Sequence, residues 1–98
     1  MDVRVRVPTQ LRELVGGAAV VEVSVGGASE DKATVATVLD GLVTQHPALE
    51  RRIRDEQGRT RTHVNLFVGS DNIRDRDGQA TPITVGDELS IIPAVSGG

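Results

Sequence analysis

The chain of 98 residues has no cysteine, one lysine and one aromatic residue. Without cysteine it can form no disulfide, no thiolate metal site and no cysteine nucleophile. With Phe67 as the only aromatic side chain, the core must be aliphatic. No apolar run approaches the roughly 20 residues that cross a bilayer, and the N-terminus lacks the features of a secretory signal. We therefore expect a cytoplasmic protein with no membrane partner.

A strong charge of one sign is also missing. The net charge of −3 argues against a nucleic-acid partner, because such binders normally carry a basic excess. The length and the 38% hydrophobic content are ordinary for one globular domain. We assign residues 1–95 to this domain and residues 96–98 to a flexible C-terminal tail.

Two segments near the N-terminus alternate between apolar and polar residues. Such alternation is typical of strands with one buried face. Pro8 ends the first segment, and a short helical turn over residues 9–13 is expected before the second. The segments predict two antiparallel strands. Their buried faces consist of Val3, Val5 and Val7, and of Val21, Val23 and Val25.

Residues 34–45 change to a helical period. Thr34 is placed to cap the helix, and Pro47 ends it or starts the next turn. Leu49 and Ile53 predict a short second helix, and residues 55–62 predict a polar surface loop. One apolar stripe should face the core, at positions spaced i, i+3, i+4, i+7 and i+8: Val35, Val38, Leu39, Leu42 and Val43.

The C-terminal half predicts a strand over residues 64–68, a turn over 69–72, a weak edge segment from Ile73 and a loop over 75–79. Gly86 and Asp87 form a turn before the last strand, residues 88–95. If Leu89 and Ile91 point into the core, the next residue, Ile92, points out, as does Ala94. The element order predicts an α+β fold in which a mixed sheet of four to five strands packs on one main helix.

Histidines and carboxylates give no catalytic pattern. His46 lies at a helix end and His63 at a strand start, and a metal site needs three or four converging ligands. No glycine-rich segment precedes a helix at the spacing of a phosphate loop. We predict no catalytic residue, no bound metal or cofactor, and no enzymatic activity of its own.

A basic cluster lies on the second predicted helix and the loop after it. Such a cluster can bind an acidic partner. The acidic residues Glu50, Asp55 and Glu56 are interspersed with it, which favours an ordinary solvated surface instead. The cluster consists of Arg51, Arg52, Arg54, Arg59 and Arg61.

The tail Ser96-Gly97-Gly98 directly follows the last strand. Glycine has no Cβ, so a diglycine can pass through a narrow channel. Three extended residues reach about 10 Å, enough to place a carboxylate inside a partner's active site. Considered alone, the diglycine equally fits a frayed chain end.

The ending GDELSIIPAVSGG, residues 86–98, resembles the terminus of the MoaD/ThiS-type ubiquitin-like sulfur carriers. Leu11-Arg12-Glu13 before a glycine-rich turn is similar to the opening of that family. The order of elements matches the family's β-grasp, or ubiquitin-like, fold along essentially the whole chain. Residues 63–68 and 71–74 and the Pro-Ala-Val-Ser-Gly-Gly end look closer to the actinobacterial CysO branch than to molybdopterin-synthase small subunits.

The resemblance implies that Gly98 carries the sulfur. An E1-like adenylating enzyme of the MoeB/ThiF type would use ATP to activate the Gly98 carboxylate, and a sulfur donor would convert it to a thiocarboxylate. Ser96 and Gly97 would pass through the partner's channel. The acceptor would be a biosynthetic enzyme such as a cysteine synthase, with a metal-dependent peptidase as a further partner.

Several alternatives stay open within this resemblance. The acceptor can be molybdopterin synthase or an enzyme that makes a thio-containing metabolite. In a different class, the chain is a ubiquitin-like protein modifier or an interaction module with an inert tail. The free chain is expected to be a monomer. Partners are expected to dock on Phe67, Ile92, Pro93 and Ala94, with Pro93 on an edge strand.

Overall fold

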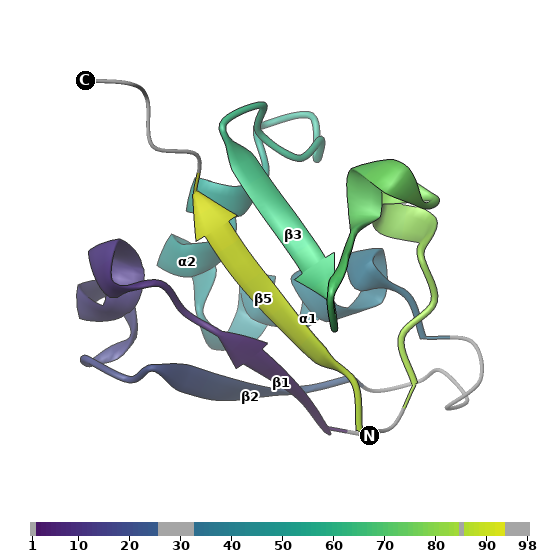
Figure 1. Cartoon of the computed structure of the whole chain (residues 1–98). Helices are drawn as coiled ribbons and strands as arrows, with labels where there is room; N and C mark the ends of the chain where they lie inside the picture. The colour runs from purple at the N-terminus through teal and green to yellow at the C-terminus, as the bar shows by residue number, and fades with distance from the viewer. Residues whose placement is uncertain (1, 26–32, 85, 94–98) are drawn as a thin grey trace.

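The computed structural model describes residues 2–25, 33–84 and 86–93 (Figure 1). Within these residues a mixed sheet has the strand order β2-β1-β5-β3-β4. Its strands are β1 (Asp2–Arg6), β2 (Val20–Ser24), β3 (Val64–Val68), β4 (Asp71–Asn72) and β5 (Glu88–Pro93). The helices are α1 (Val35–Gln45) and α2 (Pro47–Ile53).

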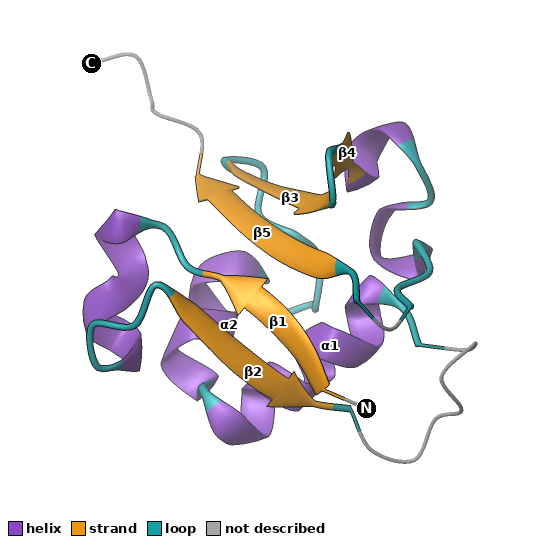
Figure 2. Cartoon of the chain, turned by 60° about the horizontal axis from the view of Figure 1, so that its bottom comes forward, coloured by secondary structure: helices purple, strands orange, loops and turns teal. Residues whose placement is uncertain are grey.

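Strand β5 occupies the centre of this sheet. It pairs parallel with β1 on one side and antiparallel with β3 on the other. Strand β1 pairs antiparallel with β2, as the two alternating segments predict. Figures 1 and 2 show α1 and α2 on one side of the sheet. The expected α+β architecture, a mixed sheet packed on a main helix, is confirmed.

The core lies between the sheet and the two helices and is entirely aliphatic. Alternate residues of every long strand point into it, and the remaining ones lie on the opposite face. Phe67 is not among the core residues, which agrees with an aliphatic core. The buried apolar side chains are Val3, Val5, Val7, Val21, Val23, Val25, Ala33, Val35, Val38, Leu39, Leu42, Leu49, Ile53, Val64, Leu66, Val68, Ile73, Ile83, Leu89 and Ile91.

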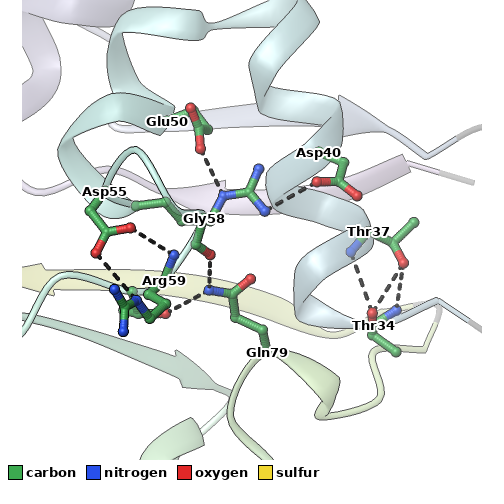
Figure 3. Close-up of polar contacts among 10 residues, drawn as sticks. Thr34, Thr37, Asp40, Glu50, Asp55, Gly58, Arg59 and Gln79 are labelled. Carbon is green, nitrogen blue, oxygen red and sulfur yellow. Dashed lines mark hydrogen bonds and ion pairs between the residues drawn. The ribbon is translucent and has the colours of Figure 1, made fainter.

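Helix α1 begins at a reciprocal cap. The Thr37 N–H donates to Thr34 Oγ1 at 3.3 Å, and the Thr34 N–H donates to Thr37 Oγ1 at 3.2 Å (Figure 3). These bonds satisfy backbone donors that have no partner inside the helix. The prediction that Thr34 caps the helix is confirmed.

The prediction that Val43 belongs to the buried stripe is wrong, because its side chain is 48% exposed. At 3.6 residues per turn, position 43 lies about 80° around the helix from position 35. The sheet covers only the narrower face made by Val35, Val38, Leu39 and Leu42.

The polar loop after α2 is held by specific bonds. Asp55 Oδ1 accepts from the Gln57 N–H at 2.9 Å and from the Arg59 N–H at 3.0 Å. Figure 3 shows the contact with Arg59. Gln79 Nε2 donates to the Gly58 carbonyl at 2.9 Å and to Thr60 Oγ1 at 3.0 Å. The predicted surface loop is therefore fastened to a segment 20 residues further along the chain, whose 3₁₀ helix η4 spans Gly78–Ala80.

Three expectations in the region after β3 are wrong. Residues 69–72 are not all turn, because Asp71–Asn72 form the short edge strand β4. Ile73 does not continue that edge. It is buried and begins the 3₁₀ helix η3 (Ile73–Asp75). Residues 75–79, expected as loop, contain the end of η3 and the start of η4.

Pro93 does not lie on an edge strand, since β5 is central. The Glu88 carbonyl accepts from the Gly69 N–H, on the β3 side. Backbone polar groups of successive residues in a strand point to alternate sides, so the nitrogen of Pro93 faces the β1 side. There the pairing with β1 ends at Ser90. The missing N–H of Pro93 therefore costs no ladder hydrogen bond.

Candidate functional site at the end of β5

The last described strand, β5, ends at Pro93 in the middle of the sheet. The predicted sulfur-carrying residue Gly98, the tail residues Ser96 and Gly97, and the docking residue Ala94 lie outside the described residues. What the structure does place is the surface around the end of β5. This surface has three parts: the helix-free face of the sheet, a groove beside β1, and the start of β3.

A turn formed by residues 84–87 fixes the start of strand β5. Gly86 has a φ of 93°, a conformation that L side chains rarely adopt, which explains a glycine before the strand. The Thr84 N–H donates to Asp87 Oδ2 at 2.9 Å, and the Asp87 N–H donates to the Thr84 carbonyl at 3.0 Å. The predicted Gly86-Asp87 turn is confirmed, and it sets the register in which Leu89 and Ile91 face the core.

Ile92 lies on the face of the sheet that neither helix covers, and its side chain is 48% exposed. Across the strands it pairs with Asn65, while Phe67 of β3 pairs with Ser90. Ile92 and Phe67 are therefore diagonal neighbours on this open face. The predicted outward orientation of Ile92 is confirmed, and Phe67, half-buried, lies beside it. Pro93 is also half-buried.

An ion pair joins β1 and β5 on the same open face. Arg6 Nε donates to Glu88 Oε1 at 2.9 Å. This hydrogen bond and the attraction of the Arg6 charge lower the pKa of the Glu88 carboxyl below its ordinary value. The same bond raises the pKa of Arg6. Both side chains stay charged at neutral pH. The open face is therefore charged at the start of β5, whereas near the end of β5 it presents the apolar side chain of Ile92.

A groove of about 420 Å³ lies between the end of β5 and the 3₁₀ helix η1 (Thr9–Val15). Its walls include Pro8 and Gln10 on one side and Ile92 and Pro93 on the other. It forms because the chain turns away from β5 after Arg6 and continues into η1. Sequence reasoning did not find this groove. The residue that could have indicated it is Pro8, which ends the alternating pattern of β1, whereas β5 extends to Pro93.

The two histidines belong to different parts of the fold. His46 caps the end of α1 and precedes α2, as expected for a helix-end histidine. His63 is exposed and immediately precedes β3. Among the described residues, no three or more histidine or carboxylate side chains are grouped closely enough to hold a metal ion. Nor does any helix in the described ranges have the length and apolarity to cross a membrane.

Comparison with known proteins agrees with this geometry. The model of the ThiS family matches residues 5–98. The chain belongs to the ThiS family. The sulfur carrier protein CysO of Mycobacterium tuberculosis is 35% identical over 100 residues, and the match covers 100% of both chains. Small archaeal modifier protein 1 of Haloferax volcanii is 39% identical over 88 residues, covering 86% of this chain and 87% of that protein.

Solved structures of family relatives superpose over nearly the whole chain. CysO in the BexX/CysO complex of Amycolatopsis orientalis has a TM-score of 0.82 at 32% identity, covering 98% of this chain and 99% of that one. Small archaeal modifier protein 1 of Haloferax volcanii has a TM-score of 0.79, also at 32% identity, with 100% of each chain covered. The β-grasp fold and the similarity to CysO are thus confirmed. This ThiS-family chain is a ubiquitin-like protein of the carrier and modifier type.

Proposed function

We propose that this ThiS-family protein carries sulfur as a thiocarboxylate on Gly98 and donates it to a biosynthetic enzyme of cysteine synthesis. The observation that carries the proposal is the match to the sulfur carrier CysO, which covers all of this chain, Gly97 and Gly98 included. The absence of cysteine agrees with it, because a carrier of this kind needs no thiol of its own.

The chemistry takes place at one carboxylate. A Gly98 oxygen attacks the α-phosphorus of ATP in an E1-like enzyme of the MoeB/ThiF type, forming an acyl-adenylate and releasing pyrophosphate. A sulfide donor then attacks the acyl carbon, AMP leaves, and the thiocarboxylate remains. Docking of the folded domain holds this nucleophile at the acceptor, which makes sulfur delivery effectively intramolecular. ATP is bound by the partner, so the carrier itself acts as a co-substrate and needs no cofactor.

The open face of β5 is the docking surface that we propose for these partners. Ile92 is exposed on that face near the end of β5, with Phe67 diagonal to it and Pro93 as the next residue of the strand. A single exposed aliphatic residue is common on protein surfaces, but apolar side chains that adjoin one another, as Ile92 and Phe67 do, are more typical of interaction sites. Ser96 and Gly97 would then pass into the partner's channel, and Ala94 would line its entrance. The site of the reaction is the cytoplasm, where ATP is available.

Intact-mass spectrometry tests the carrier function directly. Incubation with ATP, the cognate adenylating enzyme and a sulfide source should add about 16 Da, the exchange of one oxygen for one sulfur. Deletion of Gly98 should abolish the shift and leave the denaturation curve unchanged. If the deletion variant still gains this mass, Gly98 is not the acceptor of sulfur and the proposal fails.

The match to small archaeal modifier protein 1 favours a second candidate, a protein modifier joined through Gly98 to lysines of target proteins. This function needs the same adenylation, but an amine replaces sulfide as the nucleophile. The two are separated in cell lysate by probing with a tagged chain. Gly98-dependent adducts of higher mass that resist thiol and reducing agents indicate the modifier, whereas a free thiocarboxylate indicates the carrier.

Product formation identifies the enzyme that accepts the sulfur. The thiocarboxylated chain is incubated in turn with a cysteine synthase and with a molybdopterin-synthase large subunit from the same organism. We expect cysteine to form with the first. Transfer of sulfur only in the second reaction would assign the chain to molybdopterin synthesis. Transfer in neither reaction would point to another thio-containing metabolite.

A further inference from the structure

A basic surface lies beside the end of β5, separate from the apolar face. Its side chains line a pocket of about 400 Å³ formed by Arg51, Arg52, Arg61 and His63, which we call the basic corner. His63 immediately precedes β3, and the first residue of β3, Val64, pairs with Pro93. The basic corner is therefore next to the strand end that leads to the tail.

The backbone of this corner is held rigidly by two arginines. Arg61 Nε donates to the Arg51 carbonyl at 2.9 Å, which joins the loop to α2. Arg74 Nη2 donates to the carbonyls of Arg61, Thr62 and Val64 at 3.1, 3.3 and 2.8 Å. Arg74 thus fixes the segment that presents Arg61 and His63, and it brings a further positive charge next to them.

An adjoining pocket shares Arg51 and Arg61 with the basic corner, and most of the carboxylates that line it already have partners. Asp40 and Glu50 both pair with Arg54, at 3.1 and 2.7 Å. Asp55 accepts from the N–H groups of its own loop (Figure 3). The remaining carboxylate that lines the adjoining pocket is Glu56, which is exposed.

The exposed arginines of the corner, Arg51 and Arg52, have no ion pair among the described residues, whereas Arg61 already donates its Nε to the Arg51 carbonyl. None of the ion pairs among the described residues involves Arg51, Arg52 or Arg61. The corner is therefore locally basic in a chain whose net charge is −3.

We propose that the basic corner binds acidic side chains at the rim of the partner channel that receives Ser96-Gly97-Gly98. This inference rests on the proposed carrier function. An exposed charge pair contributes little affinity, but complementary charges orient two proteins and speed their encounter. Placed beside the tail, the corner orients the domain so that β5 points at the channel, while Ile92 and Phe67 supply the apolar contact.

An acidic protein surface fits the basic corner better than other anions do. Arg51, Arg52 and His63 are exposed, so the corner cannot shield a small anion such as phosphate from water. A nucleic acid is disfavoured because the negative net charge of the whole chain repels its phosphates. Carboxylates on a folded partner remain solvated and can still pair with guanidinium groups.

The first experiment needs no partner enzyme. Hexaglutamate is titrated into the labelled full chain, and the amide signals of residues 51, 52, 61 and 63 are followed by NMR. We expect these signals to move, and inorganic phosphate at equal ionic strength to leave them nearly in place. An R51Q/R52Q variant should lose the response. A matched R59Q/R76Q variant removes the same charge from arginines that already have carboxylate partners, and it should keep the response.

Three results of this titration contradict the proposal. The first is the absence of movement with hexaglutamate, and the second is an equal loss of the response in both variants. The third is an equal response to phosphate, which would make the corner a site for small anions. Because the titration involves neither ATP nor Gly98, its outcome stands even if the chain is not a sulfur carrier.

The second experiment measures thiocarboxylate formation by the adenylating enzyme at several carrier concentrations. At low salt, R51Q/R52Q should raise KM about fivefold to tenfold with kcat unchanged, and the difference should disappear in high salt. R59Q/R76Q should match the wild type. Equal KM values for the two variants would contradict the docking role of the basic corner but not the carrier function. A wild-type chain that is not modified at all would contradict the carrier function.

Discussion

At the scale of single residues, Arg54 is a charged side chain that is buried between the two helices. Its side chain is only 9% exposed, and it reaches Glu50 on its own helix and Asp40 on α1. In the sequence it is one of five arginines in a cluster, and nothing in the pattern separates it from its neighbours. The fold buries it because α2 packs against α1 at this point.

The Arg54→Met variant should be less stable than the wild type by about 2 kcal/mol, since Glu50 is only 15% exposed and would lose its partner. Urea denaturation measures the free energy of unfolding. Arg59→Met is the matched control, because Arg59 is 75% exposed and 3.8 Å from Asp55. It should leave the stability nearly unchanged. Equal losses in the two variants would show that the burial of Arg54 does not matter.

Gly41 in α1 is required by the closeness of β2. A Cβ at this position would lie 2.6 Å from Val23 Cγ1 and 3.2 Å from the Ser24 carbonyl. Alanine favours a helix over glycine by about 1 kcal/mol, but the clash should outweigh this gain. We expect Gly41→Ala to lower the free energy of unfolding by about 1–2 kcal/mol.

Thermal or urea unfolding of Gly41→Ala is compared with Val43→Ala, two positions further along the same helix. Val43 is exposed, so its truncation should change the stability by less than about 0.5 kcal/mol. A Gly41→Ala variant as stable as the wild type would mean that α1 moves away from β2 at little cost.

At the scale of elements, the alternation of β1 and β2 and the period of α1 were sufficient to predict these segments. The errors occurred where tertiary contacts decide. Val43 has the spacing of a core residue, but the sheet is too narrow to cover it. Ile73 reads as part of an edge strand, but its side chain reaches the core only if the chain turns into η3. Pro93 suggests an edge strand, yet it is the last residue of the central strand β5. A proline is tolerated there because β1 stops pairing with β5 at Ser90.

The pairing of β1 with β5 should depend on pH through Glu88. Its pKa is lower in the folded chain than its ordinary value of 4.5, so the folded state binds fewer protons there than the unfolded state. The Arg6–Glu88 contribution is therefore complete above that value and is lost as the pH falls through the lower, folded pKa. The urea midpoint of Glu88→Gln should lie below that of the wild type at pH 6.

As the pH falls through the lower, folded pKa of Glu88 the two midpoints should converge, because protonation removes the same charge from the wild type. Glu13→Gln serves as the control, since Glu13 is exposed and has no ion pair within the described ranges. A difference between Glu88→Gln and wild type that stays constant from pH 6 down to the lowest pH at which the chain is still folded would exclude the ion pair as its cause.

At the scale of the whole molecule, the structure separates two faces. The helices cover one side of the sheet, and the other side presents Ile92 and Phe67 beside the end of β5. Ile92 and Val43 are both 48% exposed, but they lie on opposite sides of the molecule, one on the open sheet face and one on a helix. This pair provides a test of which face the partner contacts.

Ile92→Arg should raise the KM of the adenylating enzyme for the carrier about tenfold, because a charge replaces an apolar contact near the centre of the interface. Val43→Arg, with the same change at the same exposure, should leave KM unchanged. Both variants should unfold at the wild-type midpoint, since neither side chain is in the core. Equal kinetics for the two variants would place the docking surface elsewhere.

The sequence by itself determined the main segments β1, β2, β3, β5, α1 and α2, the aliphatic core and the likeness to sulfur carriers, because these follow from local periodicity and from one contiguous motif, residues 86–98. Only the tertiary structure decided what surrounds the end of β5. Pairing of β5 with β3 brings Val64 to Pro93 and hence the basic corner to the strand end, although these segments are about 30 residues apart in the chain. The groove at η1 likewise depends on where β1 leaves the sheet. Such neighbours are set by strand order, which no local pattern encodes.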